Sequence, residues 1–128
     1  QLAYKTTAED LLEEAMTCYK NNEFEGALEK IQSSLELYPD NSDAYQYLGN
    51  SFYKLGATDK ALDAYIKARD LQPENESVLE NIGVIYANRG EYKKAVLQWG
   101  EILKLNPDRH DIVEKLQKIQ HVLRQRYL

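Results

Sequence analysis

Cysteine is almost absent from this sequence of 128 residues, and proline is rare. The single cysteine, Cys18, excludes an internal disulfide and a metal site built from several cysteines, and it leaves the compartment open. No run approaches the roughly 18 consecutive apolar residues of a membrane-spanning helix, so we expect no direct membrane insertion. The net charge of −5 lacks the excess of lysine and arginine that phosphate binding needs. We therefore expect no nucleic-acid partner.

The few prolines are spaced regularly. They stand at Pro39, Pro73 and Pro107, a constant step of 34 residues. Other residues that keep this step are Ala27, Ala61 and Ala95, Gly49 and Gly83, and Gly56 and Gly90. Self-similarity at a fixed period of this length predicts a stack of tandem helical repeats, each a single supersecondary unit.

The spacing of the apolar and small residues resembles the tetratricopeptide repeat. The second unit carries the signature of that family at Tyr45, Leu48, Gly49, Phe52, Gly56, Ala61, Tyr65, Ala68 and Pro73. The third carries it at Leu79, Ile82, Gly83, Tyr86, Gly90, Ala95, Trp99 and Pro107, with Ile102 where the pattern has a small residue. The first unit diverges, because Glu14 replaces an apolar residue and Cys18 an aromatic one. We assign 1–7 to an extension, 8–41, 42–75 and 76–109 to three repeats, and 110–128 to a capping helix, all within one domain.

The resemblance implies an all-α fold, a right-handed superhelix of helix-turn-helix repeats with about seven helices. Apolar periodicity places them at 8–21, 24–38, 42–55, 58–71, 76–89, 92–105 and 109–126. Gly56 and Gly90 should end first helices in the left-handed conformation. The pattern of Thr7 with Asp10 predicts a capping box at the first helix, and Asn41 and Asn75 are good N-caps. Tyr65 and Trp99 should be core residues.

The resemblance also implies a binding surface, because in this family the first helix of each pair lines a concave groove. The repeat register places these candidate partner-binding residues on it: Met16, Tyr19, Gln46, Tyr47, Asn50, Tyr53, Lys54, Asn81, Val84, Asn88 and Lys115. Rings supply rigid contact area, and amides both donate to and accept from an extended backbone. Tyr47, Asn50, Tyr53 and Asn81 are the central candidates. The alternative interpretation is that they are ordinary surface residues and half-buried tyrosines.

Some family members clamp the acidic carboxyl-terminal tails of chaperones with lysines, asparagines and an arginine. The matching positions here are Gln46, Asn50, Asn81, Asp111 and Lys115. The asparagines and one cation agree with that clamp, but Asp111 would repel a carboxylate. We therefore do not expect this chain to be a chaperone-tail clamp.

Catalytic constellations are not evident in the sequence. His110 and His121 are eleven residues apart, whereas histidines that share a metal on one helical face are three or four apart. We expect no enzyme activity, no metal and no cofactor.

The sequence favours a protein-interaction scaffold or adaptor that holds a peptide or helix of a protein partner in its groove. One alternative is a self-assembling homo-oligomer, based on the ten tyrosines and an apolar strip at Leu2 and Tyr4. Another is a substrate-recruiting segment of a larger enzyme. Because the chain begins with Gln1 rather than Met, we expect a processed product or a piece of a longer chain.

Overall fold

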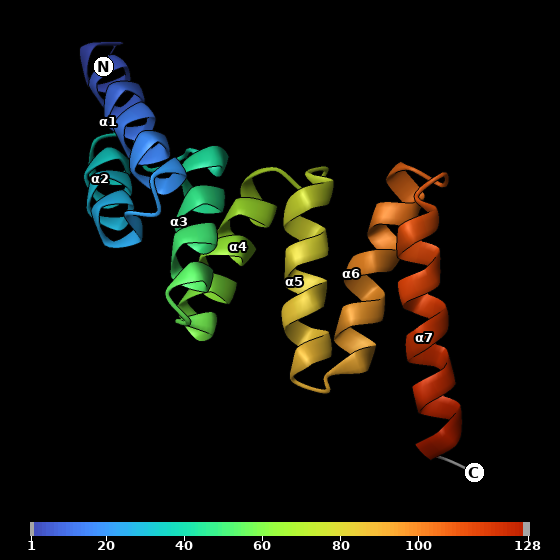
Figure 1. Cartoon of the computed structure of the whole chain (residues 1–128). Coiled ribbons are helices and arrows are strands. Elements are labelled where there is room, and N and C mark those ends of the chain that lie inside the picture. Colours follow the sequence, from blue (N-terminus) through green and yellow to red (C-terminus); the bar gives the residue numbers. More distant parts are fainter. Residues whose placement is uncertain (1, 127–128) are drawn as a thin grey trace. The chain divides into compact units, whose positions relative to one another are not determined.

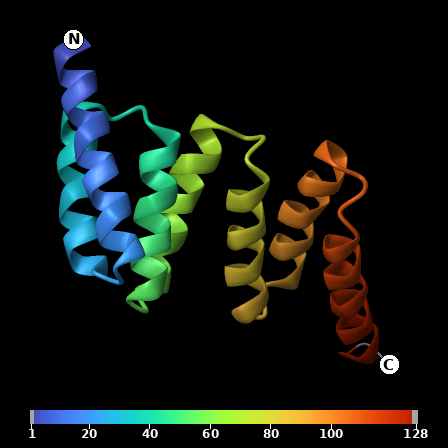
Figure 2. The same ribbon diagram turned by 45° about the horizontal axis from the view of Figure 1, so that its top comes forward.

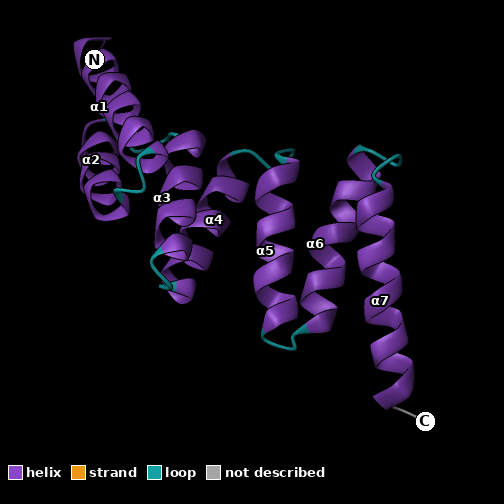
Figure 3. Ribbon diagram, viewed as in Figure 1, coloured by secondary structure: helices purple, strands orange, loops and turns teal. Residues whose placement is uncertain are grey.

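The described part of the chain is built from helices joined by short loops (Figure 3). The computed structural model describes residues 2–126, without the side chains of Leu2 and Tyr4. Within these residues the helices are α1 (Leu2–Lys20), α2 (Phe24–Leu37), α3 (Ser42–Lys54), α4 (Thr58–Leu71), α5 (Glu76–Asn88), α6 (Tyr92–Leu105) and α7 (His110–Arg126). The predicted all-α helical-repeat class is confirmed. No helix of the described residues is both long and apolar enough to cross a membrane.

The helices group into two compact units, each described by itself below. Unit 1 extends to Pro73 and contains α1 to α4, whereas unit 2 begins at Glu74 and contains α5 to α7. In unit 1, α1 packs on α2 and α3 on α4, and α2 packs against α3 (Figures 1 and 2). In unit 2, α5 packs on α6, and α7 packs on α6 (Figures 1 and 2). Helix hairpins are therefore the building blocks of both units.

The turn inside each hairpin repeats one backbone conformation. Gly56 has φ +79° and Gly90 has φ +78°, the left-handed region in which a residue without a Cβ is not strained. The prediction that these glycines end first helices is confirmed. In the first hairpin the same register position holds Asn22, with φ 61°. Asparagine tolerates this region better than most residues with a side chain, so the divergent repeat keeps the turn without glycine.

The ends of the second helices also repeat. Tyr38, Gln72 and Asn106 have φ of −143°, −143° and −145°, and each directly precedes a proline. Proline disfavours the α region for the residue before it, so each helix ends at the preceding residue. The predicted caps of the following helices are confirmed as well. Asn41 Oδ1 accepts hydrogen bonds from the amides of Asp43 and Ala44, and Asn75 Oδ1 accepts one from Val78.

The amino-terminal helix begins earlier than the sequence predicts. Helix α1 starts at Leu2, so the expected start near residue 8, after a capping box at Thr7, is wrong. The Thr7 hydroxyl instead donates to the carbonyl of Ala3, one turn upstream, at 3.0 Å. No proline or glycine interrupts residues 2–7, so the helix anchored by buried Ala8 and Leu12 continues through them. The proposed apolar strip at Leu2 and Tyr4 concerns side chains outside the described residues.

Each unit has its own apolar cluster. In unit 1 the cluster consists of Leu12, Ala15, Ala27, Ile31, Ala44, Leu48 and Ala64. In unit 2 it consists of Leu79, Ala95, Trp99, Ile102, Ile112 and Ile119. Ile112 and Ile119 come from α7, which therefore closes the cluster of unit 2 with one apolar stripe.

The two mid-helix glycines allow close packing of a ring. A Cβ on Gly49 would lie 2.6 Å from ring carbons of Tyr65, and one on Gly83 would overlap the Trp99 indole. Tyr65 is 2% exposed and Trp99 is 4% exposed, which confirms both as core residues. Each ring packs against a glycine of the preceding helix, so the two helices of the hairpin can approach closely.

Candidate functional site

The predicted site residues divide between the two units. Unit 1 holds Met16 and Tyr19 on α1 and Gln46, Tyr47, Asn50, Tyr53 and Lys54 on α3. Unit 2 holds Asn81, Val84 and Asn88 on α5 and Lys115 on α7. Tyr53, Lys54 and Asn88 are exposed and the others are half-buried. Val84 packs against the apolar cluster of unit 2, so part of its surface serves the core.

In unit 1 the side chains of two repeats meet. The rings of Tyr19 on α1 and Tyr47 on α3 form an edge-to-face pair, with centroids 6.3 Å apart and planes at 72°. Tyr19 also forms an edge-to-face pair with Phe24, the first residue of α2, at 5.2 Å between centroids. Partial burial raises the pKa of Tyr19, and the neighbouring Tyr47 hydroxyl adds a smaller effect in the same direction. Two of the predicted site residues, Tyr19 and Tyr47, are therefore in contact within unit 1.

Asn50 is held by a core tyrosine that the sequence analysis treats only as packing. The Tyr65 hydroxyl, on α4, donates to Asn50 Oδ1 at 2.6 Å. Burial raises the pKa of Tyr65, with smaller effects from Tyr19 and Tyr53, so its hydroxyl stays protonated and donates. Because Oδ1 is occupied, the amide nitrogen of Asn50 is the group left to donate elsewhere.

We call the half-exposed side chains of Tyr19, Tyr47, Asn50 and Tyr53 the aromatic face of unit 1. Tyr53 is 41% exposed, the most open of the large rings in this group. The face combines three rings, which bury apolar area at little entropic cost, with one oriented amide donor. It is suited to noncovalent binding of an extended chain or an apolar helix.

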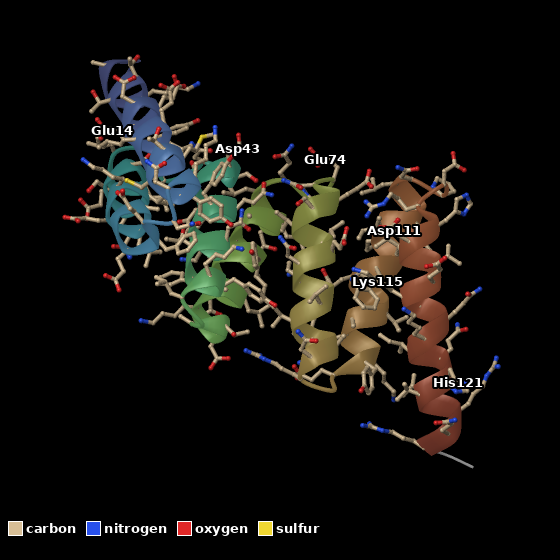
Figure 4. All side chains as sticks on the ribbon, in the orientation of Figure 1. Glu14, Asp43, Glu74, Asp111, Lys115 and His121 are labelled. Carbon is tan, nitrogen blue, oxygen red and sulfur yellow. The ribbon has the colours of Figure 1, made fainter. Side chains whose placement is uncertain are left out.

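In unit 2 the corresponding helices carry an ion-pair network. Arg109, just before α7, donates to Glu76 Oε1 at 2.9 Å, to Glu80 Oε1 at 2.6 Å and to Asp111 Oδ2 at 2.8 Å. Lys115 Nζ donates to Glu80 Oε2 at 3.1 Å. Asp111 and Lys115 lie one turn apart on α7 (Figure 4).

The network shifts the acidity of its members. Burial raises the pKa of Glu80, but the hydrogen bonds from Arg109 and Lys115 together outweigh it and leave the pKa below its ordinary value. The hydrogen bond from Arg109 lowers the pKa of Asp111 to about 2. The same bonds raise the pKa of Arg109. These groups are therefore charged across the physiological range.

Lys115 is engaged inside unit 2. Besides its bond to Glu80, its Nζ lies 5.6 Å from the centroid of the Trp99 ring. Its charge is thus balanced by a carboxylate of the same unit rather than left for a partner. The sequence did not reveal Arg109 as part of this arrangement, because it lies in a loop and its partners are up to 33 residues away.

The described residues contain no cluster of side chains suited to bind a metal ion. No three His, Cys, Asp or Glu side chains gather there as metal ligands. His121 is exposed on α7 (Figure 4), and its Nε2 lies 3.1 Å from Gln125 Nε2.

Comparisons with known proteins match the central part of the chain to tetratricopeptide repeats. A family model described as TPR repeat matches residues 49–90, and one described as tetratricopeptide repeat matches residues 31–63. A search of curated protein sequences gives no match.

Three solved structures illustrate the similarity of fold. The first TPR of Spaghetti (RPAP3), bound to the HSP90 peptide SRMEEVD, has a TM-score of 0.84 at 17% identity, covering 93% of this chain and 94% of that one. The Arabidopsis OM64 TPR domain has a TM-score of 0.81 at 19% identity, covering 90% and 98%. MamA has a TM-score of 0.76 at 25% identity, covering 84% of this chain and 63% of that one.

Proposed function

We propose that this chain, which matches tetratricopeptide-repeat models over residues 31–63 and 49–90, is an adaptor that binds a peptide or helix of a partner protein. The contact surface is the aromatic face of unit 1. The observation that carries the proposal is the meeting of Tyr19 and Tyr47 from successive repeats beside an asparagine whose orientation is set by Tyr65.

The chemistry of this face supports a polypeptide ligand. A peptide backbone offers carbonyl acceptors, and the amide nitrogen of Asn50 is a donor aimed by its bond to Tyr65. An apolar side chain of the ligand would bury surface against Tyr47 and Tyr53. Rigid rings and an oriented amide lower the entropic cost of binding, because little of the receptor must be ordered.

An acidic carboxyl-terminal tail is not supported as the ligand. The peptide in the RPAP3 structure is acidic near its end, but the cation of this chain at the corresponding clamp position is Lys115, which donates to Glu80. Asp111, at another clamp position, adds a negative charge. We therefore place the binding surface on unit 1 and propose a different class of ligand below.

The experiment is a quantitative pull-down from an extract of the source organism with three baits. They are the unaltered chain, Asn50→Asp/Tyr53→Ser, and the control Leu97→Ser/Gln117→Glu, which makes a matched change of charge and apolarity on α6 and α7. Asn50→Asp keeps an acceptor for Tyr65 while removing the amide donor. Circular dichroism checks that all three are equally helical.

We expect at least one protein to be retained by the unaltered chain and by the control, and reduced about tenfold or more on the Asn50→Asp/Tyr53→Ser bait, since losing one oriented donor and one ring removes roughly 1–3 kcal/mol. Equal retention on all three baits would contradict a role for the aromatic face. Loss on the control bait alone would move the binding surface to unit 2.

A further inference from the structure

The residues that flank the aromatic face carry opposite charges at its two ends. On α1, positions 9, 13, 16 and 20 follow one another at helical spacing and so share one side of the helix. On α3, positions 43, 47, 50 and 54 do the same at the same register. Carboxylates stand at the amino-terminal end, on Glu9, Glu13 and Asp43, and cations at the carboxyl-terminal end, on Lys20 and Lys54. Of the aromatic face, Tyr47 and Asn50 lie between them, and Tyr19 and Tyr53 directly precede the two lysines.

These flanking charges have no ion-pair partner among the described residues. Glu9, Glu13 and Asp43 are all exposed. Figure 4 labels Asp43 in the first turn of α3. Elsewhere on α1, in contrast, Glu14 is paired with Lys30 of α2 at 3.1 Å. The carboxylates beside the face are therefore available to an external cation.

The polarity is confined to unit 1. In the third repeat the corresponding positions hold Ser77 and Asn81 in place of the acids, and Asn88 in place of the lysine. The acid that α5 carries nearby, Glu80, is already bound by Arg109 and Lys115. Only the first two repeats thus present a surface with an acidic end, an aromatic centre and a basic end.

We propose that the partner of this face is a segment that places lysine or arginine side chains directly beside a large apolar anchor. The inference rests on the proposed function and adds the chemistry of its ligand. The cations of the segment lie against Glu9, Glu13 and Asp43, and the apolar anchor lies on Tyr19, Tyr47 and Tyr53. Lys20 and Lys54 repel a cation from the other end, so the charge pattern sets the direction in which the segment lies.

Charge complementarity at an exposed rim changes affinity moderately and depends on salt. Each exposed ion pair contributes little by itself, and three together change the dissociation constant by about tenfold. The effect should weaken between 50 mM and 500 mM salt, because exposed charges are screened. The apolar part of the binding is not expected to weaken with salt.

The test uses six fluorescein-labelled twelve-residue peptides with the full chain, read by fluorescence anisotropy. All contain a central Leu-Phe-Leu segment, flanked on its amino or its carboxyl side by three lysines, three glutamines or three glutamates. The charge variant is Glu9→Gln/Glu13→Gln/Asp43→Asn. Its matched control, Glu25→Gln/Glu29→Gln/Glu36→Gln, removes the same charge from exposed positions of α2. A third variant, Asn50→Asp/Tyr53→Ser, reports on the aromatic face.

We expect one lysine peptide to bind at least about tenfold more tightly than its glutamate counterpart, with the glutamine peptide between them. The charge variant should lose about tenfold for the lysine peptide and less than about twofold for the glutamine peptide, while the control loses less than about twofold for both.

Three results would overturn the inference. If the charge variant and its control weaken the lysine peptide equally, net charge alone attracts it. If lysine and glutamine peptides bind equally and both depend on Asn50 and Tyr53, the proposed function stands and the basic ligand is wrong. If none of the six peptides binds in a way that Asn50→Asp/Tyr53→Ser weakens, the inference and the proposed aromatic face both fail.

Discussion

Ser51 is a residue whose contribution to stability is unfavourable. It is fully buried, and its Oγ has no hydrogen-bond partner among the described residues. A buried hydroxyl without a partner loses its hydration with no compensation. The same register position in the third repeat is the buried Ile85, which needs no hydrogen bond.

We predict that Ser51→Ala raises the free energy of unfolding by about 1 kcal/mol, measured by urea denaturation. Ser34 is the matched control, since it is equally buried but donates to the carbonyl of Ala8 at 2.6 Å. Ser34→Ala should lower the free energy of unfolding by about 1 kcal/mol. A loss of stability in both variants would show that Ser51 has a partner after all.

The bond between Asn50 and Tyr65 separates a structural role from a binding role. Asn50→Ala leaves the buried Tyr65 hydroxyl without its acceptor, so we predict a loss of about 1–3 kcal/mol in the free energy of unfolding. Adding Tyr65→Phe removes the hydroxyl and should return part of that loss. The double-mutant cycle in urea measures the coupling, and strictly additive losses would contradict the hydrogen bond.

At the scale of the helices, the same substitution is expected to have opposite effects on stability at two glycines, Gly90 just before α6 and Gly100 inside it. Gly90 has φ +78° and Gly100 lies inside α6, and a Cβ at either would meet no atom within 4 Å. Only the backbone conformation differs. Gly90→Ala should therefore lower the free energy of unfolding by about 1–2 kcal/mol, and Gly100→Ala should raise it by about 1 kcal/mol.

Trp99 is the only tryptophan and lies in unit 2 with both glycines, so its fluorescence during urea unfolding measures both variants. A loss of stability in Gly100→Ala would mean that α6 needs the glycine for a reason not found in the described contacts.

The ion-pair network is an interaction between elements, since it ties α7 to α5. Arg109→Gln leaves Glu76, Glu80 and Asp111 without their shared cation, so we predict a loss of about 1–2 kcal/mol. Lys118→Gln is the control, because it removes the same charge from an exposed position of α7. The midpoint of thermal unfolding, followed by Trp99 fluorescence, should fall only in Arg109→Gln. Equal falls in both variants would show that the loss of one positive charge, rather than of the network, causes the effect.

The same network predicts how unit 2 responds to acid. Hydrogen bonding to Arg109 lowers the pKa of Asp111 from 3.8 to about 2, so its stabilisation is present above pH 3.8 and is lost as the pH falls toward 2. Glu80, whose pKa is also lowered, contributes with the same sign. In an acid titration of Trp99 fluorescence, Arg109→Gln should move the midpoint to higher pH. An unchanged midpoint would show that protonation of Glu80 and Asp111 does not contribute to the acid unfolding of unit 2.

At the scale of the whole molecule, the features that the sequence predicted are those set by local backbone chemistry, above all the ends of the helices. Pro39, Pro73 and Pro107 restrict the residue before them, and Gly56 and Gly90 adopt a conformation that other residues avoid, so helix ends could be placed closely. The start of α1 could not, because the cap pattern at Thr7 competes with a helix that nothing upstream interrupts.

The sequence could predict which helix faces carry the candidate site, but not the contacts between its side chains. A period of 34 residues places Tyr19, Tyr47 and Asn50 on equivalent faces, because the same helix in each repeat turns the same side outward. Which side chains bond to each other depends on rotamers and on helix crossing, which no spacing encodes. The bonds of Asn50 to Tyr65 and of Lys115 to Glu80 therefore emerged only from the structure.

The central claim is that the aromatic face of unit 1 is the surface a partner touches. Site-specific photo-crosslinking tests it most directly, with p-benzoylphenylalanine placed at position 53 on the face or at position 97 on α6, where Leu97 is 66% exposed. After irradiation in an extract of the source organism, the account predicts a discrete crosslinked protein from position 53 and none from position 97. The same adduct from position 97, with none from position 53, would contradict it.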